Sequence, residues 1–160
     1  MVALVVVAIG LLGLAKMESL ALSSTGVASS RSLAAIQPSS MAAAMHANRA
    51  YWASGTAPAS TIVDASAANN FSGATACTTV GACTTPTQVA FYDLWKWGVA
   101  LSALLPGYSA TITCTTAGFP VNCTIQVQWV ENAVAANSQQ ATQLAATSLQ
   151  APTYLVYVEP

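Results

Sequence analysis

Four cysteines are the residues whose types and spacing most clearly indicate chemistry. Cys77 and Cys83 form one close pair, and Cys114 and Cys123 form another, with five and eight residues between the partners. An even number of cysteines at short spacings favours disulfide bonds made in an oxidising compartment. A zinc site would favour C-x₂-C pairs or added histidines, whereas His46 is the only histidine. Four cysteines allow three pairings, and we expect the one between sequence neighbours.

Two further groups have the residue types of functional sites but lack the sequence surroundings. Serines, His46 and Asp93 nominally complete a hydrolase triad, but no nucleophile-elbow sequence surrounds any serine, and His46 falls on a predicted helix. Trp95 and Trp97 suggest a carbohydrate platform, but Trp97 belongs to a predicted apolar helix face, so packing is the better interpretation. The sequence therefore favours a protein that is not an enzyme and needs neither a cofactor nor a metal ion.

The composition indicates an apolar environment. Of the 160 residues, 54% are hydrophobic and only 6% are charged, against the roughly 25% charged residues of soluble domains. The formal net charge is -1 and the four basic residues are scattered, which argues against nucleic acid as a partner. The length fits one domain.

The chain opens on "MVALVVVAIGLLGLAKMES", in which residues 1–15 carry no charge. A membrane-spanning helix needs about 20 apolar residues, and a secretory signal needs basic residues ahead of its apolar core. We therefore interpret the run as most of a longer apolar helix whose first turns precede Met1. The glycines would let neighbouring helices approach closely. The expected helix-packing residues are Val2, Leu4, Val6, Ile9, Gly10, Leu11, Gly13 and Leu14.

One long helix is predicted over residues 1–54, followed by a globular head over residues 55–160. Pro38 is the only strong helix breaker in the first segment, and we expect a bend there. The stretch that follows, "GTAPASTIVDASAANNFSGATA", is punctuated by glycine and proline and predicts an irregular connection. The apolar residues that recur at helical spacing in the second half of the helix are Ile36, Met41, Met45 and Trp52.

A second helix is predicted over residues 86–105. Thr85 has the position of an N-cap, Pro86 that of the first helical residue and Gln88 that of the capping-box partner. Pro106 and Gly107 end the helix. The residues expected on its buried face are Ala90, Leu94, Trp97, Leu101 and Leu104.

Alternation of apolar and polar residues then predicts strands over residues 109–114, 121–130 and 153–158. The first two form a hairpin with Cys114 and Cys123 near its tip. Residues 131–150 fit either a surface loop or a marginal helix. The fold class is therefore α+β, with a long apolar helix and an antiparallel sheet of about three to four strands. The expected head core is Trp52, Leu94, Trp97, Leu101, Leu104, Ile125, Val127 and Trp129.

Several stretches together resemble a known family. "MVALVVVAIGLLGLA" is similar to the hydrophobic start of type IV pilins, and "MAAAMHANRAYW", "DLWKWGVALSALLPG", "TIQVQWVE" and "TYLVYVEP" resemble PilV-type minor pilins in the same order. The resemblance covers almost the whole chain. In that family the mature protein begins with an N-methylated aromatic residue, and a glutamate follows shortly after. No residue of this sequence matches either, so processing and glutamate-mediated docking are assigned to no residue here.

The resemblance implies a pilin-like fold and a minor pilin of the type IV pilus. Such a protein acts with other minor pilins and the major pilin to prime pilus assembly, and it supports adhesion and twitching motility. A pilus-tip adhesin is a further candidate partner. The subunit waits in the inner membrane with a periplasmic head and then enters the pilus. Two alternatives remain open, namely a type II secretion pseudopilin and a membrane-anchored periplasmic binding module unrelated to pili.

Overall fold

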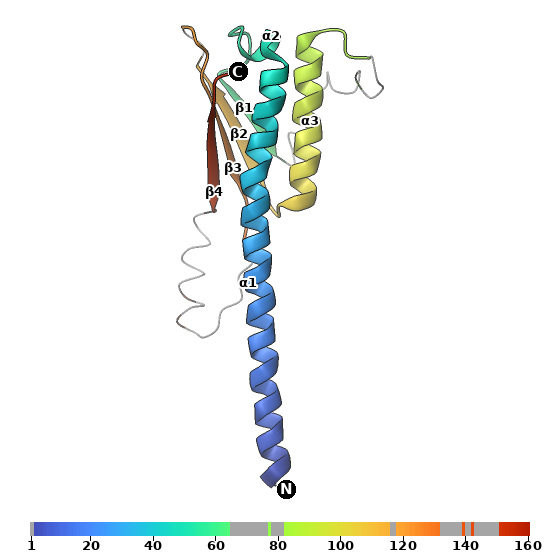
Figure 1. Cartoon of the computed structure of the whole chain (residues 1–160), viewed down its shortest axis with the longest axis vertical. Helices are drawn as coiled ribbons and strands as arrows, with labels where there is room; N and C mark the ends of the chain where they lie inside the picture. The colour runs from blue at the N-terminus through green and yellow to red at the C-terminus, as the bar shows by residue number, and fades with distance from the viewer. Residues whose placement is uncertain are drawn as a thin grey trace.

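The structure, a computed structural model, describes residues 2–64, 77, 82–115, 118–131, 139, 142 and 151–160. A long apolar helix carries a small head with a second long helix and an antiparallel sheet, so the predicted α+β fold class is confirmed (Figure 1). The elements are α1 (Val2–Ala47), α2 (Arg49–Trp52), β1 (Ser60–Asp64), α3 (Pro86–Leu104), β2 (Ser109–Cys114), β3 (Cys123–Gln128) and β4 (Thr153–Val158).

Helix α1 continues through Pro38 but ends at Ala47, earlier than residue 54. Asn48 leaves the helical region with φ -117° and ψ 53°, and α2 then forms a separate short turn. The buried Asn48 amide donates a hydrogen bond from Nδ2 to the carbonyl oxygen of Pro86 at 2.7 Å. This bond joins the end of α1 to the start of α3. The low helix propensity of asparagine favours the interruption of the helix at this position.

The buried face of α1 differs in one residue from the predicted face. Ile36 is 57% exposed, so its placement on the apolar face is wrong. The spacing of four, three and four residues that follows one side of a helix runs instead through Ala34, and a residue two positions later points to the opposite side. The residues of α1 that pack into the head are Ala34, Pro38, Met41 and Met45.

The sheet is a four-stranded antiparallel meander in the order β1-β2-β3-β4. Strand β1 lies inside the stretch predicted to be an irregular connection, so that prediction is wrong for residues 60–64. Its partner is β2, with Ile62 opposite Thr111. The bounds of β2 and β4 agree with those predicted, whereas β3 is shorter than residues 121–130. Most of the connection after β1 and most of residues 131–150 lie outside the described residues.

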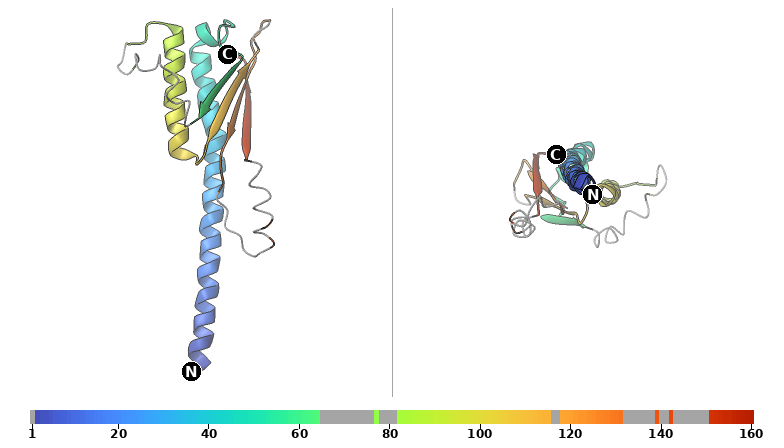
Figure 2. Two further views of the ribbon diagram at one scale, coloured as in Figure 1. Left: turned by 180° about the vertical axis from the view of Figure 1, so that it is seen from behind. Right: turned by 90° about the horizontal axis from the view of Figure 1, so that it is seen from below.

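Two helices cover one face of the sheet. Helix α1 packs over β3 and β4, and α3 packs beside it over β1. Both views of Figure 2 show the two helices on the same side of the sheet. Gly98 on α3 allows the close approach, because a Cβ atom there would lie 2.9 Å from Cγ1 of Val63. The fully buried residues on this face of the sheet are Val63, Ala110, Ile112, Ile125 and Val127.

Helix α3 begins at the predicted capping box. The Thr85 hydroxyl accepts from the Gln88 backbone N–H at 3.3 Å, and Oε1 of Gln88 accepts from the Thr85 N–H at 3.2 Å. Along the helix, Ala90, Leu94, Trp97 and Leu101 are buried.

The end of α3 corrects the predicted core. Leu104 is 37% exposed, whereas Leu105 is only 1% exposed and takes the place predicted for Leu104. The reason is local: at Leu105 the backbone becomes extended, with φ -125° and ψ 113°. This change of conformation turns the Leu105 side chain into the core.

Candidate functional site

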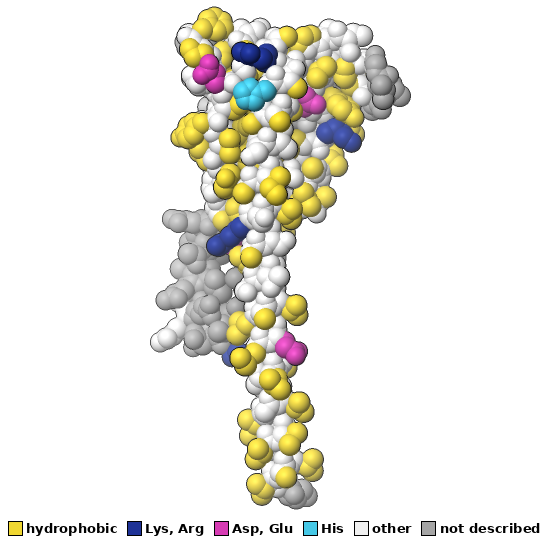
Figure 3. Space-filling view, viewed as in Figure 1, with side chains coloured by type: hydrophobic (Ala, Val, Ile, Leu, Met, Phe, Trp, Pro, Cys, Tyr) yellow, Lys and Arg dark blue, Asp and Glu magenta, His cyan; other side chains and the backbone are white. Residues whose placement is uncertain are grey.

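The first part of α1 carries apolar side chains on every side and packs against no other described element. We call residues 2–22 the apolar rod. Every residue from 2 to 19 is exposed, and Figure 3 shows apolar side chains along both sides of this part of the helix in the view drawn. A Cβ atom added at Gly10 or Gly13 would meet nothing within 4 Å. The eight predicted helix-packing residues all lie here, and within one chain they pack against no other described element. The most exposed are Val2, Leu4, Leu12 and Leu22.

The rod has the dimensions of a membrane-spanning segment. Residues 2–22 extend about 32 Å at 1.5 Å per residue, and hydrocarbon is about 30 Å thick. Helix α1 is long and apolar enough to cross a membrane, with a mean hydropathy of 1.9 over its most apolar window and none of that window buried. Lys16 and Glu18 are the only charged residues of the rod. A rod of this kind is compatible with membrane anchoring.

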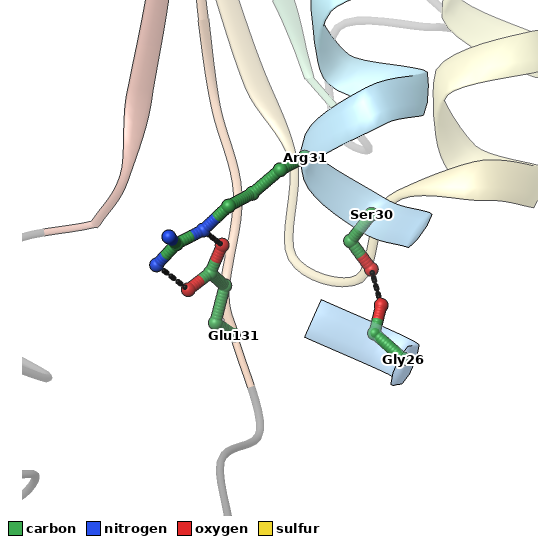
Figure 4. A network of polar contacts seen from close by, with 4 residues as sticks. All are labelled: Gly26, Ser30, Arg31 and Glu131. Atoms are coloured by element: carbon green, nitrogen blue, oxygen red, sulfur yellow. Dashed lines mark hydrogen bonds and ion pairs between the residues drawn. The ribbon is translucent and has the colours of Figure 1, made fainter. Parts of the chain in front are cut away.

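Above the rod, one ion pair fastens α1 to the chain beyond β3. Arg31 Nε donates to Glu131 Oε1 at 2.8 Å and Nη2 donates to Oε2 at 2.9 Å, in the bidentate arrangement of Figure 4. We call this pair the clasp. It joins residues 100 positions apart, and no local sequence pattern identifies a pair so distant along the chain. The hydrogen bonds from Arg31 are the main cause that lowers the pKa of Glu131.

The clasp predicts a dependence of stability on pH. Because the pKa of Glu131 is lowered on folding, the pair stabilises the fold above the unfolded-state pKa of about 4.3, and the contribution is lost as the pH falls through the folded-state pKa. The Arg31 side chain is 63% exposed, so solvent screens the pair and Glu131→Gln should cost only about 0.5–1 kcal/mol at pH 7.

Urea unfolding at pH 7 and pH 3 checks this expectation. The difference between the native chain and Glu131→Gln should shrink toward zero at pH 3. Glu159→Gln removes an exposed carboxylate and serves as the matched control, with little effect at either pH. An effect of Glu131→Gln that is equal at both pH values would contradict a role for the ionised pair.

A groove of about 360 Å³ between α1 and α3 contains Asp93. Burial raises the pKa of this carboxyl group. His46 is exposed and does not line the groove, so the nominal triad of serine, His46 and Asp93 is not assembled. Trp97 is buried and donates from Nε1 to the Gln37 carbonyl oxygen at 3.0 Å, which fits the packing interpretation rather than a ligand platform.

Both cysteine pairs are bonded between sequence neighbours, Cys77 with Cys83 and Cys114 with Cys123. Cys114 and Cys123 face each other across β2 and β3 with Cα atoms 4.1 Å apart, and both side chains are buried. Their bond therefore ties the two central strands together at the base of the hairpin tip. Among the described residues, no group of three metal-ligating side chains gathers.

The other predicted core residues take their places in the head. Trp52, Leu94, Leu101, Ile125 and Val127 are at most 1% exposed, and Trp97 and Trp129 are also buried, at 5% and 3% exposed. Comparison with protein-family models, with curated proteins and with solved structures finds no match to this chain. The chemistry of the molecule is therefore argued from its own surfaces, of which the apolar rod is the most unusual.

Proposed function

We propose that the chain is a minor pilin of the type IV pilus. The apolar rod lies in the inner membrane before assembly and then packs among the rods of other pilins, while the head faces the periplasm and later the cell surface. One observation carries the proposal: a helix that is apolar on every side and exposed over residues 2–19 continues without interruption into a packed head. Such a surface is unfavourable in water and needs either lipid or other apolar helices around it.

The disulfides support the proposed location of the head. All four cysteines are bonded, and bonds of this kind form and persist in an oxidising compartment such as the periplasm. The scarcity of charge in the rod supports its place among other apolar helices. The resemblance of five sequence stretches to pilins, in the same order, points to the same assembly and to other minor pilins and the major pilin as partners.

A replacement of the rod tests assembly separately from anchoring. In the native host, residues 2–15 are either deleted or exchanged for an unrelated apolar helix of equal length. Deletion should release a head that stays in the aqueous fraction after ultracentrifugation. The exchanged chain should remain in membranes but be absent from purified pili, because the filament requires contacts specific to the rod. Ala103→Ser, at an exposed position of α3, is the control and should leave both properties unchanged.

Deletion of the whole gene then separates the pilus from its alternatives. Loss of pili and of twitching motility, with protein secretion intact, is the expected result. Normal pili together with blocked release of secreted proteins would overturn the proposal in favour of a pseudopilin. Normal piliation by the chain that lacks residues 2–15 would also contradict it.

A further inference from the structure

The outer face of the sheet, opposite α1 and α3, has apolar residues only along its two edges. Ile62 on β1 is 54% exposed, and Leu155 and Tyr157 on β4 are 41% and 80% exposed. The register places Ile62 and Leu155 at the two ends of one row across the sheet, with Thr111 and Gln126 between them. The outward residues of the two central strands are all hydroxyl or amide side chains: Ser109, Thr111, Thr113, Thr124, Gln126 and Gln128.

Both edges of the sheet are unpaired in the part of the chain that the structure describes, because no strand there pairs with the outer side of β1 or of β4. Strand β4, "TYLVYV", has neither a charge nor a proline, and the only charge of β1 is Asp64 at its last position. Edge strands that stand alone are normally protected by charged residues, proline or bulges, and an uncharged apolar edge is a site for pairing with another chain.

The direction of the strands determines which edge strand of one copy can pair with which edge strand of a second copy. Each strand is antiparallel to the next, so β1 and β4 at the two ends of a four-stranded sheet run in opposite directions. Two copies that stand side by side in the same orientation therefore bring β4 of one against β1 of the other as an antiparallel pair. Antiparallel pairing of β4 with β4 would instead point the two α1 helices in opposite directions. Two rods that enter one membrane from the same side must point in the same direction, which excludes the pairing of β4 with β4.

The helix layer matches the sheet in width. Four strands at about 4.8 Å each occupy about 19 Å, and two helices packed about 8–10 Å apart occupy about 16–20 Å. Since α1 covers β3 and β4 while α3 covers β1, a copy shifted by one sheet width continues both layers. The similar widths leave room for the neighbouring sheet to pair while its helices continue the helix layer.

We propose that the chain associates with a second copy of itself by pairing β4 of one copy with β1 of the next. Leu155 lies opposite Ile62 of the second copy, which extends the row of Ile62, Thr111, Gln126 and Leu155 across the boundary. The exposed apolar side chains of the two edges then cover each other. The interface joins two different surfaces, so the pair keeps one free β1 edge and one free β4 edge for further copies.

The inference rests on the insertion of the rod into a membrane, which is part of the proposed function, but it does not depend on a pilus. The full chain is therefore tested in phosphatidylcholine vesicles, where flotation reports insertion independently. Ile62→Cys and Leu155→Cys chains are mixed and mildly oxidised. Directly opposite residues have Cβ atoms about 4.5–5.5 Å apart, close enough for a disulfide after a small adjustment.

The expected product is a dimer linked between residues 62 and 155, identified by mass spectrometry of its peptides. Leu155→Cys alone should give no dimer. Thr111→Cys mixed with Leu155→Cys is the matched control, and it should give none because Thr111 lies on a central strand. Absence of the 62–155 link in chains that float would overturn the inference and leave the proposed function standing. A link between two copies of residue 155 would also overturn it, in favour of a two-fold pair.

A charge at the edge provides a second measurement that needs no new cysteine. Leu155→Lys should reduce energy transfer between fluorescently labelled copies in the vesicles at least fivefold. Thr124→Lys places the same charge on the same face of β3 and should leave the transfer unchanged. Unchanged transfer in Leu155→Lys would overturn the inference. Chains that fail to float would contradict the insertion of the rod, and with it both the inference and the proposed function.

Discussion

Replacing Trp52 with alanine is expected to lower the free energy of unfolding by about 3–5 kcal/mol, the range for deleting a large aromatic side chain from a core. Trp52 is fully buried and lies edge-to-face against Tyr51, with ring centroids 5.0 Å apart. It is the last residue of α2, which packs against both α1 and α3, so a cavity at this position would weaken the packing at the end of the head. Guanidinium unfolding followed by the fluorescence of the remaining tryptophans measures the loss.

Two variants separate packing from other contributions at this position. Trp52→Phe should cost much less, because it retains a ring and loses no hydrogen bond: the indole N–H of Trp52 has no partner among the described residues. Trp95→Ala removes the same side chain from a half-buried position on α3 and should cost clearly less than Trp52→Ala. Equal losses for the two alanine variants would contradict the assignment of Trp52 to the centre of the core.

Removal of the bond between Cys114 and Cys123 is expected to cost about 3 kcal/mol. The two residues are nine positions apart, and a closed loop of that size removes about that much chain entropy from the unfolded state. The variant Cys114→Ala with Cys123→Ala also leaves small voids, since both side chains are buried. Urea unfolding of the double variant, compared with the native chain, measures the effect.

The second disulfide serves as the matched comparison. Cys77 and Cys83 are six positions apart, so their bond closes a shorter loop and should contribute less. Cys83 is only half-buried, and its replacement by alanine should leave less of a void. A larger loss from Cys77→Ala with Cys83→Ala than from the first double variant would show that the link between the central strands is not the more important of the two.

The elements that follow from local patterns were predictable from the sequence. Helix α3 begins where Thr85 and Gln88 form a capping box, and that box needs no distant partner. The alternation of Cys123, Ile125 and Val127 marks the buried face of β3 in the same way. The apolar rod was predictable because it is defined by composition alone. A run of apolar residues can be recognised without knowing which other elements the helix contacts.

The features that depend on distant partners escaped prediction. Strand β1 has only five residues beside a stretch rich in small residues, and it is stabilised by pairing with β2 far along the chain. The clasp between Arg31 and Glu131 and the bond from Asn48 to Pro86 also join remote positions. Leu105 replaced Leu104 in the core because the helix ends there, and periodicity assumes that a helix continues. The two complementary sheet edges depend on strand order, which no local pattern contains.

The continuity of α1 from the rod into the head fixes the azimuth of the head. An α-helix turns about 100° and rises about 1.5 Å for each residue. One residue inserted between Leu22 and Arg31 would therefore rotate the head by more than a quarter turn about the rod while raising it by scarcely more than the length of a bond. When lipid or other helices hold the rod in a fixed orientation, the number of residues in α1 therefore determines the direction in which the edges of the sheet face.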